Sequence, residues 1–371
     1  MRILYWTPEF YPEITGGIEM LSWKALPAFQ KHNYEFLVVT SHGLQPLPDK
    51  TEFNGIPIHR FYFREALQNP KKIILYQKQI AELKRSFDPD VVHYHFGDAF
   101  CYFHVATART HPAPSLVTLH MSVAGYMGGS DTVIGRLLRQ ASWVVGVSEA
   151  TLADARQTVP DITQRSSVIN NCLDLHHLSP QKLNFDEPRL LCLGRVIDVK
   201  GFDLAIAAFS ELRRRFPNSR LIIAGDGPAR PDLERQSNAL GLTDVVDFLG
   251  LVDPGNIPEL MNKTTVVLVP SRPGDSFPLV AIQAAQMARP LVAARVGGLP
   301  ELIMHRQTGL LIEEENIEEL VEAVTFLLEN PERAVRYGQA GRKQAQELFS
   351  LDKCVNAYDV LYRKLSGNLI S

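Results

Sequence analysis

One segment, residues 266–301, constrains the fold more than any other, because it predicts two buried parallel strands joined by a helix. Residues 266–269 form a continuous apolar run closed by Pro270, which is typical of a central parallel strand buried on both faces. Residues 280–287 have the alanine-rich composition of a helix, and a second apolar run follows at residues 291–294. Such a unit predicts an α/β domain whose ligands bind at the carboxyl ends of its strands.

The chain has 371 residues, which predicts two α/β domains rather than one. Apolar runs alternate with helical patterns in the first half, and a second set follows from Arg189. The expected strands are residues 3–6, 36–40, 91–94, 115–119 and 143–147 in the first set, and 190–193, 220–224, 245–249, 266–269 and 291–294 in the second. The polar stretch 179–188 is the expected linker. Two doubly wound domains joined in this way are expected to make a cleft.

The composition is that of an ordinary globular protein, with 45% hydrophobic residues, 21% charged residues and a formal charge of -3. This balance argues against nucleic acid as a partner. The four cysteines form no CxxC pair, which predicts buried free thiols in a reducing compartment. Pro8 and Glu9 come too early for a signal peptide, and no run approaches the ~18 apolar residues of a membrane span. We therefore expect a cytoplasmic protein.

Two cations flank the loop after the expected strand 190–193. Arg195 and Lys200 lie within the sequence GRVIDVKG at residues 194–201, just before a helix. A planar guanidinium and a mobile ammonium together suit two phosphate groups. The alternative interpretation is a pair of solvated loop cations.

Two glycines, Gly16 and Gly17, lie in a long loop between the first expected strand and a helix beginning near Ile18. Glycines in this position let backbone N–H groups approach a phosphate at a helix N-terminus. A tight turn without a ligand is the alternative interpretation.

His120 directly follows the expected strand 115–119, so its imidazole is expected at the carboxyl edge of the first sheet. A neutral imidazole both donates and accepts hydrogen bonds, which suits the orientation of a hydroxyl group. His93 and His95 alternate on one strand and therefore share a face, as a metal-binding pair would. No further ligand lies at suitable spacing, so we expect no metal site and interpret them as a hydrogen-bonded pair.

The segment described first resembles the signature of retaining glycosyltransferases of the GT-B fold, in glycosyltransferase family four. The matching residues are Pro-Ser at 270–271, SFPLV at 276–280 and GGLPE at 297–301. In that family the loop and the helix carry two glutamates eight positions apart. The matching residues here are Asp275 and Gln283, so neither glutamate is present.

The resemblance implies a fold of two doubly wound Rossmann-like domains facing across a cleft. Residues 1–180 would bind the acceptor, residues 181–350 would bind the nucleotide-sugar, and residues 351–371 would form a helix that packs back on the first domain. Several site residues are also implied by the resemblance. Arg195, Lys200 and the backbone of Gly16 and Gly17 would hold the donor diphosphate, while His120 and Asp275 would lie near the sugar.

Further donor-binding positions follow from the same resemblance. Gln283 would face the ribose hydroxyls with one carbonyl acceptor and an amide in place of a carboxylate. Leu279 and Val280 would begin the donor-binding helix. Gly225 would lie near the base and phosphate, where a plain turn is the alternative. Glu301 is a candidate compensating carboxylate, and a helix-start acid is its alternative.

A basic amphipathic helix is expected in the first half. Its apolar face consists of Ile73, Tyr76, Ile80, Leu83 and Phe87. Its basic residues are Lys71, Lys72, Lys78, Lys84 and Arg85. Related enzymes with lipid-linked acceptors dock on membranes through this domain, so peripheral membrane association is one hypothesis, and a solvated helix face is the other.

The predicted function is transfer of a sugar from a nucleotide diphosphate donor, a UDP-sugar in preference to a GDP-sugar, to a sugar or lipid-linked sugar acceptor, without a cofactor. Asp275 and Gln283 leave two alternatives open. One is a catalytically impaired protein that binds a nucleotide-sugar or assists a partner subunit, and the other is a nucleotide-sugar isomerase. The acceptor would contact residues 96–103 and 121–132, whose sequence does not identify it.

Overall fold

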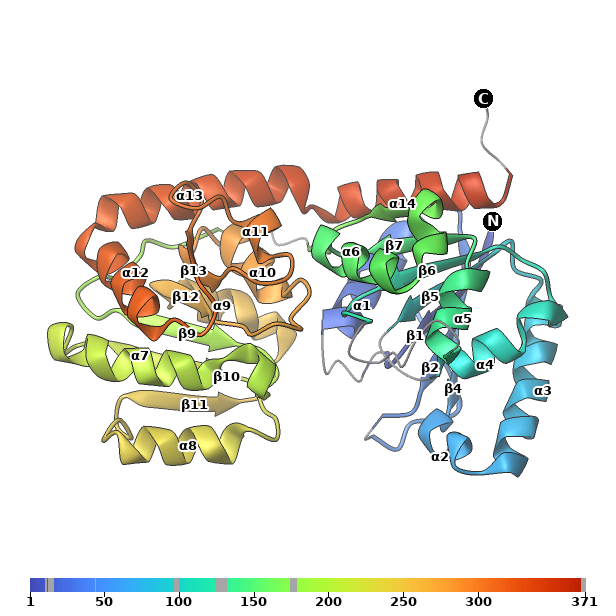
Figure 1. Cartoon of the computed structure of the whole chain (residues 1–371), viewed down its shortest axis with the longest axis horizontal. Coiled ribbons are helices and arrows are strands. Elements are labelled where there is room, and N and C mark those ends of the chain that lie inside the picture. The colour runs from blue at the N-terminus through green and yellow to red at the C-terminus, as the bar shows by residue number, and fades with distance from the viewer. Residues whose placement is uncertain are drawn as a thin grey trace. The chain divides into compact units, whose positions relative to one another are not determined.

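The chain forms two compact units, each built around its own sheet (Figure 1). The computed structural model describes residues 1–10, 12, 17–43, 45–96, 100–123, 132–173 and 179–367. The first unit comprises Met1–Asn171 with Leu351–Ser371, and the second comprises Cys172–Ser350. The stretch 179–188 belongs to the second unit, where the backbone N–H of Gln181 donates to Asn262 Oδ1 (2.9 Å). The predicted α/β class is confirmed.

The sheet of the first unit has the order β3-β4-β2-β1-β5-β6-β7-β8. Its strands are β1 (Arg2–Thr7), β2 (Glu35–Ser41), β3 (Lys50–Phe53), β4 (Ile56–Phe61), β5 (Val91–Phe96), β6 (Ser115–Leu119), β7 (Trp143–Gly146) and β8 (Ser166–Val168). All neighbours are parallel except β3 and β4, which form a hairpin. Asn54 (φ 50°) and Gly55 (φ 79°) make its turn, the Asn-Gly pair that hairpins favour. The sequence prediction missed β3, β4 and β8.

The described helices of the first unit are α1 (Gly17–Gln30), α2 (Phe63–Leu67), α3 (Pro70–Phe87), α4 (Cys101–Ala106), α5 (Val133–Gln140), α6 (Glu149–Thr158) and α14 (Leu351–Leu365). The predicted basic amphipathic helix is α3. It begins at Pro70, where the Asn69 side chain accepts hydrogen bonds from two backbone N–H groups, and it ends at Asp88 in the left-handed conformation. Asn69 and Asp88 therefore mark the start and the end of this helix in the sequence.

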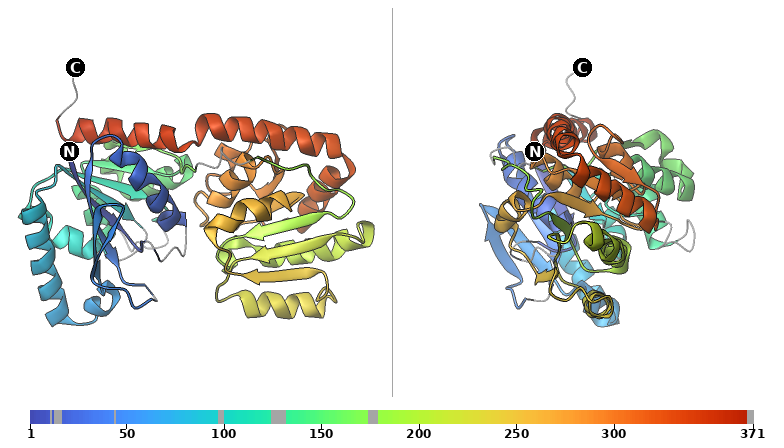
Figure 2. Two further views of the ribbon diagram at one scale, coloured as in Figure 1. Left: turned by 180° about the vertical axis from the view of Figure 1, so that it is seen from behind. Right: turned by 90° about the vertical axis from the view of Figure 1, so that its left-hand side faces the viewer.

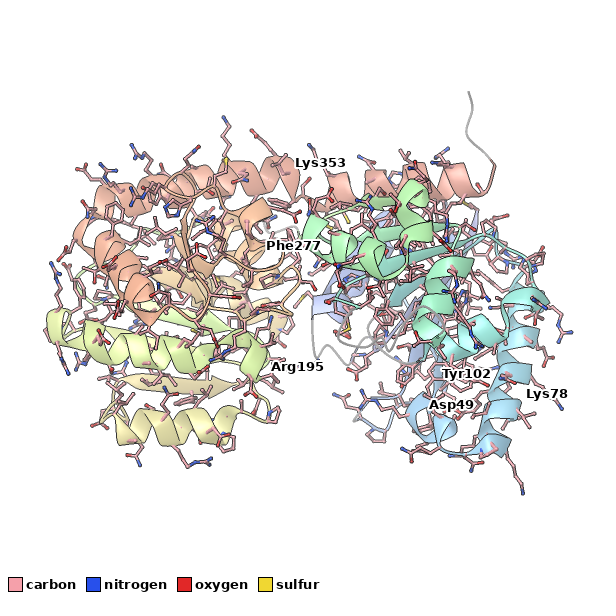
Figure 3. The ribbon with its side chains drawn as sticks, viewed as in Figure 1. Asp49, Lys78, Tyr102, Arg195, Phe277 and Lys353 are labelled. Atoms are coloured by element: carbon pink, nitrogen blue, oxygen red, sulfur yellow. The ribbon has the colours of Figure 1, made fainter. Side chains whose placement is uncertain are left out.

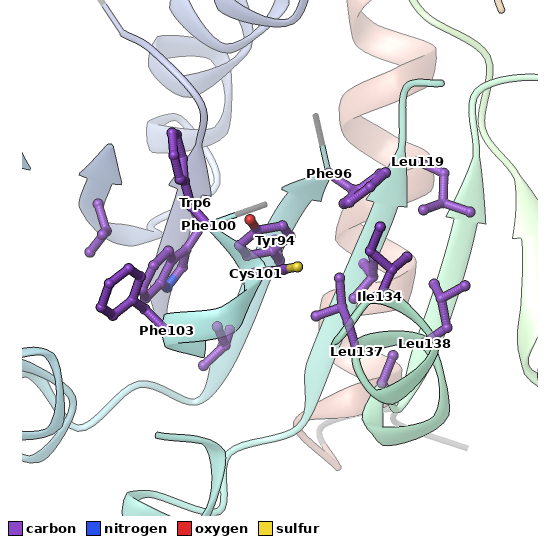
Figure 4. Close-up of a cluster of buried hydrophobic side chains, with 14 of the residues drawn as sticks. Trp6, Tyr94, Phe96, Phe100, Cys101, Phe103, Leu119, Ile134, Leu137 and Leu138 are labelled. Carbon is purple, nitrogen blue, oxygen red and sulfur yellow. The ribbon is translucent and has the colours of Figure 1, made fainter. Parts of the chain in front are cut away.

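One face of the first sheet is apolar (Figure 4). Trp6, Tyr94 and Phe96 project from β1 and β5 onto this face, where Phe103 of α4 and Leu137 of α5 cover them. They belong to a larger cluster of buried hydrophobic side chains, whose burial stabilises this side of the sheet.

The opposite face of the same strands is polar and aromatic. Tyr5, His93, His95 and Thr118 alternate with the apolar residues, as the two-residue period of a strand requires. Helices α1 and α14 pack against each other, with Phe29 of α1 beside the rings of Tyr358 and Tyr362 of α14. The tyrosine hydroxyls reach the strands: Tyr362 Oη lies 2.6 Å from His93 Nδ1, and Tyr358 Oη lies 3.0 Å from Thr118 Oγ1. The last helix is thereby part of the first unit.

The sheet of the second unit is entirely parallel, in the order β11-β10-β9-β12-β13-β14 (Figure 2). Its strands are β9 (Arg189–Leu193), β10 (Arg220–Ala224), β11 (Val246–Gly250), β12 (Val266–Val269), β13 (Leu291–Ala294) and β14 (Leu310–Ile312). Its helices are α7 (Phe202–Arg215), α8 (Arg230–Ala239), α9 (Ile257–Asn262), α10 (Leu279–Gln286), α11 (Leu299–Leu302), α12 (Ile317–Glu329) and α13 (Pro331–Leu348). This is the doubly wound strand order of dinucleotide-binding folds. Strand β14 was not predicted.

Two sequence expectations outside the sheets can be compared with the structure. All four cysteines, Cys101, Cys172, Cys192 and Cys354, are free and buried, as predicted. Within the described residues, every helix is too short or too polar to cross a bilayer.

Candidate functional site

The strand order of the second sheet reverses between β9 and β12, which are adjacent and parallel. Ligands of open α/β sheets bind at such a switch point, outside the carboxyl ends of the strands. The loop after β9 carries Arg195 and Lys200, and the loop after β12 carries Asp275. Three of the predicted site residues therefore share one edge of one sheet.

Lys200 and Asp275 form an ion pair in which Lys200 Nζ donates to Asp275 Oδ2 at 2.8 Å. Ser271 Oγ donates to the same oxygen at 2.6 Å. The Asp275 side chain is 8% exposed and that of Lys200 is 20% exposed. The two hydrogen bonds recorded for this carboxylate within the described residues both go to Oδ2, so Oδ1 keeps its acceptor capacity. An ammonium with three donors likewise keeps N–H groups for a ligand.

The loop after β12 is fixed by Arg272, a residue that the sequence did not single out. Its guanidinium makes two parallel hydrogen bonds to the Asp203 carboxylate (2.8 and 2.7 Å) and a further one to Glu315 Oε1 (2.7 Å). Burial alone raises the pKa of Asp203, but the hydrogen bonds and charge of Arg272 outweigh it and hold that pKa below its usual value. The bidentate pair ties the loop of Asp275 to the start of α7, directly after Lys200.

Two glycines allow the close backbone contacts of this edge. Gly201 has φ 64°, and a Cβ atom there would lie 1.9 Å from the carbonyl oxygen of Pro270. Gly297 has φ 52°, and a Cβ atom there would lie 2.1 Å from the carbonyl oxygen of Asp275. Both positions need glycine for its conformation and for its size. The predicted site residue Gly225 (φ 135°) packs in the same way against Gly194 after β10.

Helix α10 places Gln283 in a buried position, with 5% of its surface exposed. Its side-chain amide makes no hydrogen bond with another described residue. Leu279 and Val280 are half-buried in the first turn of this helix, and no side chain caps its start. The first N–H groups of a helix have no partner within the helix. The helix therefore places a buried amide, and the backbone N–H groups of its first turn, beyond the end of β12.

The two remaining predicted residues of the second unit lie nearer the surface. Arg195 is exposed (Figure 3), and no ion pair of its guanidinium is recorded in the described part of the chain. Glu301 is half-buried in the short helix α11. An exposed cation in the same loop as Lys200 is suited to an anionic ligand.

In the first unit, His120 directly follows β6, as predicted. Its Nε2 lies 2.8 Å from His95 Nδ1. Burial lowers the pKa of His120 to about 3, so the imidazole is neutral at physiological pH. His93 bonds to Tyr362 and Thr118, and among the described residues no group of three or more metal-ligating side chains is suited to holding a metal ion.

Part of the predicted site lies outside the described residues. Gly17 begins α1 and is exposed, whereas Gly16 is not among the described residues. The same holds for residues 97–99 and 124–131 of the two expected acceptor loops.

Comparison with known proteins identifies the family. The family model described as Glycosyltransferase Family 4 matches residues 15–177, and the model described as Glycosyl transferases group 1 matches residues 177–344. The glycogen synthase of Mycobacterium tuberculosis is 30% identical over 75% of this chain and 69% of its own length. A GDP-mannose-dependent alpha-(1-6)-phosphatidylinositol monomannoside mannosyltransferase of Mycolicibacterium smegmatis is 33% identical over 43% of this chain and 44% of its own length.

Two solved structures share the fold. Sucrose-phosphate synthase from Thermosynechococcus elongatus has a TM-score of 0.85 at 21% identity, over 99% of this chain and 100% of the other. Anabaena Alr3699/HepE in complex with UDP-glucose has a TM-score of 0.80 at 19% identity, over 98% of this chain and 100% of the other. The fold and the site thus define a glycosyltransferase of the GT-B fold that uses a nucleotide-sugar donor. The chain belongs to glycosyltransferase family 4.

Proposed function

We propose that this glycosyltransferase is a retaining, metal-independent enzyme that transfers a sugar from a UDP-sugar, in preference to a GDP-sugar, to a sugar or lipid-linked sugar acceptor. The observation that carries the proposal is the hydrogen-bonded cluster of Lys200, Asp275 and Ser271 at the switch point of the second sheet. In this cluster two hydrogen bonds join the cation that we assign to the leaving diphosphate with the carboxylate that we assign to the sugar.

The charge that develops on the diphosphate is the main electrostatic demand of the reaction. Lys200 is held in place by Asp275, and Arg195 is close in sequence and exposed, so both cations are available to phosphate oxygens. Asp275 Oδ1 is available to accept a hydrogen bond from a sugar hydroxyl. His120 contributes a neutral imidazole from the first unit, which we assign to the same sugar.

Gln283 binds the ribose more weakly than a glutamate would. Its carbonyl oxygen accepts from one ribose hydroxyl, but its NH₂ group faces the other hydroxyl, and charge assistance is absent. We expect a loss of donor affinity of about 1–2 kcal/mol relative to a carboxylate. This weakens donor binding but leaves the reaction intact.

The base of the donor is assigned from two of the similar proteins. The UDP-glucose of the HepE complex supports UDP, and the GDP-mannose dependence of the mycobacterial relative supports the alternative. We give precedence to UDP because that structure resembles this chain over its whole length, whereas the mannosyltransferase matches less than half of it.

Calorimetric titration with UDP, GDP and ADP tests the donor, followed by mass spectrometry of the matching nucleotide-sugars after incubation with the protein. We expect UDP to bind most tightly and UDP-sugar to release UDP slowly to water. Arg195→Ala and Lys200→Ala are expected to weaken UDP binding, whereas Lys263→Ala, which removes an exposed cation paired with Glu259, is not. Preference for GDP would overturn the donor assignment, and binding without release would overturn the reaction.

Peripheral membrane association through α3 is a further proposal. Lys84 is 1% exposed, so the basic face expected from the sequence is wrong at this position. Lys71 and Lys78 are exposed beside Ile74 and Leu75, whose exposed fractions are 55% and 50% (Figure 3). Basic residues around exposed aliphatic ones favour an anionic bilayer surface.

Co-sedimentation with vesicles of phosphatidylglycerol and phosphatidylcholine at low salt measures this association. We expect the wild type to bind these vesicles and Ile74→Glu to abolish the binding. Absence of the protein from the vesicle pellet would remove the proposal.

A further inference from the structure

Two histidines of the first unit share a hydrogen bond that fixes where protons lie near the proposed sugar site. His95 Nδ1 and His120 Nε2 are 2.8 Å apart, and the two rings stack with centroids 5.1 Å apart. His95 projects from β5 and is 3% exposed. Since one of the two nitrogens must donate, the pair has two possible proton arrangements.

Both imidazoles are neutral, so each carries one N–H proton. Burial, together with the neighbouring His93 and His120, lowers the pKa of His95 well below its usual value, and burial lowers that of His120. The position of the single proton on His95 therefore decides which ring donates.

The environment of the other His95 nitrogen separates the two arrangements. His95 Nε2 is buried and has no hydrogen-bond partner within the described part of the chain. A proton on Nε2 would bury an unpaired N–H group, which is rare in folded proteins because no hydrogen bond compensates its loss of water. A proton on Nδ1 satisfies the donor and leaves a lone pair unpaired. The arrangement with the proton on His95 Nδ1 is therefore favoured.

From this geometry we infer that His95 is a positioning residue, which donates from Nδ1 to His120 Nε2 and so fixes His120 as its Nδ1–H tautomer. His120 then presents a hydrogen-bond donor, and not an acceptor, to the ligand that it contacts. This step rests on the proposed function, in which His120 contacts the sugar. The group that His120 recognises is then a lone pair on a sugar oxygen.

The neighbours of His95 hold its ring in one orientation. The rings of Tyr5 and His93 lie 4.5 and 4.1 Å from it, measured between centroids. His93 is itself held between Tyr362 and Thr118, at 2.6 and 2.9 Å. A ring enclosed in this way keeps Nδ1 directed at His120, which is the requirement for setting a tautomer.

Long-range ¹H–¹⁵N correlation spectra of the uniformly ¹⁵N-labelled full-length protein measure the tautomers directly, with His120→Asn and His95→Asn used to assign the signals. We expect both rings as Nδ1–H tautomers at pH 7.5. An Nε2–H tautomer of His120, or averaged shifts from exchange between tautomers, would overturn the inference. This readout needs no activity, so it stands apart from the proposed function.

Kinetics of nucleotide release then test the consequence for the reaction. His95→Leu removes the donor and is expected to lower kcat by about 10- to 100-fold, as the loss of a positioning partner does. His95→Asn restores an amide donor near the place of Nδ1 and is expected to recover most of that loss. If His95→Leu and His95→Asn both fold and lose kcat to the same extent, the positioning role is contradicted. Unchanged activity of His120→Asn would instead contradict the proposed role of His120, with the tautomer result unaffected.

Discussion

At the scale of single residues, Gln283 carries the clearest departure from the family pattern. Its amide is buried and its matching family residue is a glutamate. We predict that Gln283→Glu tightens UDP binding by about 1–2 kcal/mol, which is about 5- to 30-fold in Kd, because a carboxylate accepts from both ribose hydroxyls. Titration calorimetry measures the change.

Gln286 supplies a matched control for this substitution. It lies on the same helix, is 2% exposed, and its Nε2 donates to the carbonyl oxygen of Leu173. Gln286→Glu also buries a carboxylate but loses that donor, so it should lower stability without changing UDP affinity. Equal UDP affinity of Gln283→Glu and the wild type would show that Gln283 does not face the ribose.

Lys84 is a second residue with a measurable effect, which is on the pH dependence of the free energy of unfolding. Its ammonium lies among Thr107 Oγ1 (3.0 Å) and the carbonyl oxygen and Nδ1 of His104 (both 3.4 Å), and burial lowers its pKa to about 7. The unfolded lysine has a pKa of about 10.4. Between these values the unfolded state binds more protons, so Lys84 makes the free energy of unfolding increase with pH.

We therefore predict that Lys84→Met is more stable than the wild type at pH 7 and that this advantage shrinks by roughly 2 kcal/mol at pH 9, since one pKa unit corresponds to about 1.4 kcal/mol. Urea unfolding at both pH values measures it. Lys78→Met, an exposed change on the same helix, should show no such pH dependence. A stability difference independent of pH would mean that Lys84 remains charged in the folded state.

At the scale of elements, the loops after β9 and β12 depend on Gly201. We predict that Gly201→Ala costs more than the ~1–2 kcal/mol of a left-handed alanine, because the new Cβ meets the Pro270 carbonyl oxygen. Gly241 is the matched control: its φ is 68°, and a Cβ there meets nothing within 4 Å. Urea unfolding compares the two alanine variants. Equal losses in the free energy of unfolding would show that the loop around Pro270 moves to accommodate the Cβ atom without destabilising the protein.

Much of each sheet was predictable because buried parallel strands are continuous apolar runs. Strands β10, β12 and β13 match their predicted residues, and the pairing of Lys200 with Asp275 follows from two adjacent strand ends. The hairpin of β3 and β4 was missed because its first strand, Lys50–Phe53, is short and polar. Strands β8 and β14 are three residues each, too short for a periodic signal.

Contacts between distant elements were not predictable from local patterns. Arg272 was not singled out from the sequence, since its partners Asp203 and Glu315 come from other elements. Lys84 follows Leu83 on the helical pattern and was assigned to the basic face, whereas α4 supplies the contacts that bury it. The proton position on His120 likewise depends on His95, which belongs to another strand.

At the scale of the whole molecule, the chain completes its first unit with its last helix. Residues buried on α14 include Val355, Tyr358, Leu361 and Tyr362, and Lys364 Nζ lies 3.7 Å from the ring centroid of Trp143. All three tryptophans, Trp6, Trp23 and Trp143, belong to the first unit. Tryptophan fluorescence therefore reports the unfolding of that unit alone.

Ending the chain after Ser350 is expected to lower the urea midpoint of the tryptophan transition, with a loss of at least about 3 kcal/mol, because several buried aromatic and aliphatic side chains are removed together. Hydrogen exchange in β9, β10 and β12 should remain that of the full chain, since these strands lie in the other unit. A chain ending at Gly367 keeps α14 and serves as the control. An unchanged tryptophan transition in the shorter chain would show that α14 covers the polar face of the first sheet without stabilising it, and Tyr362 and Tyr358 would then not be needed to hold His93 and Thr118.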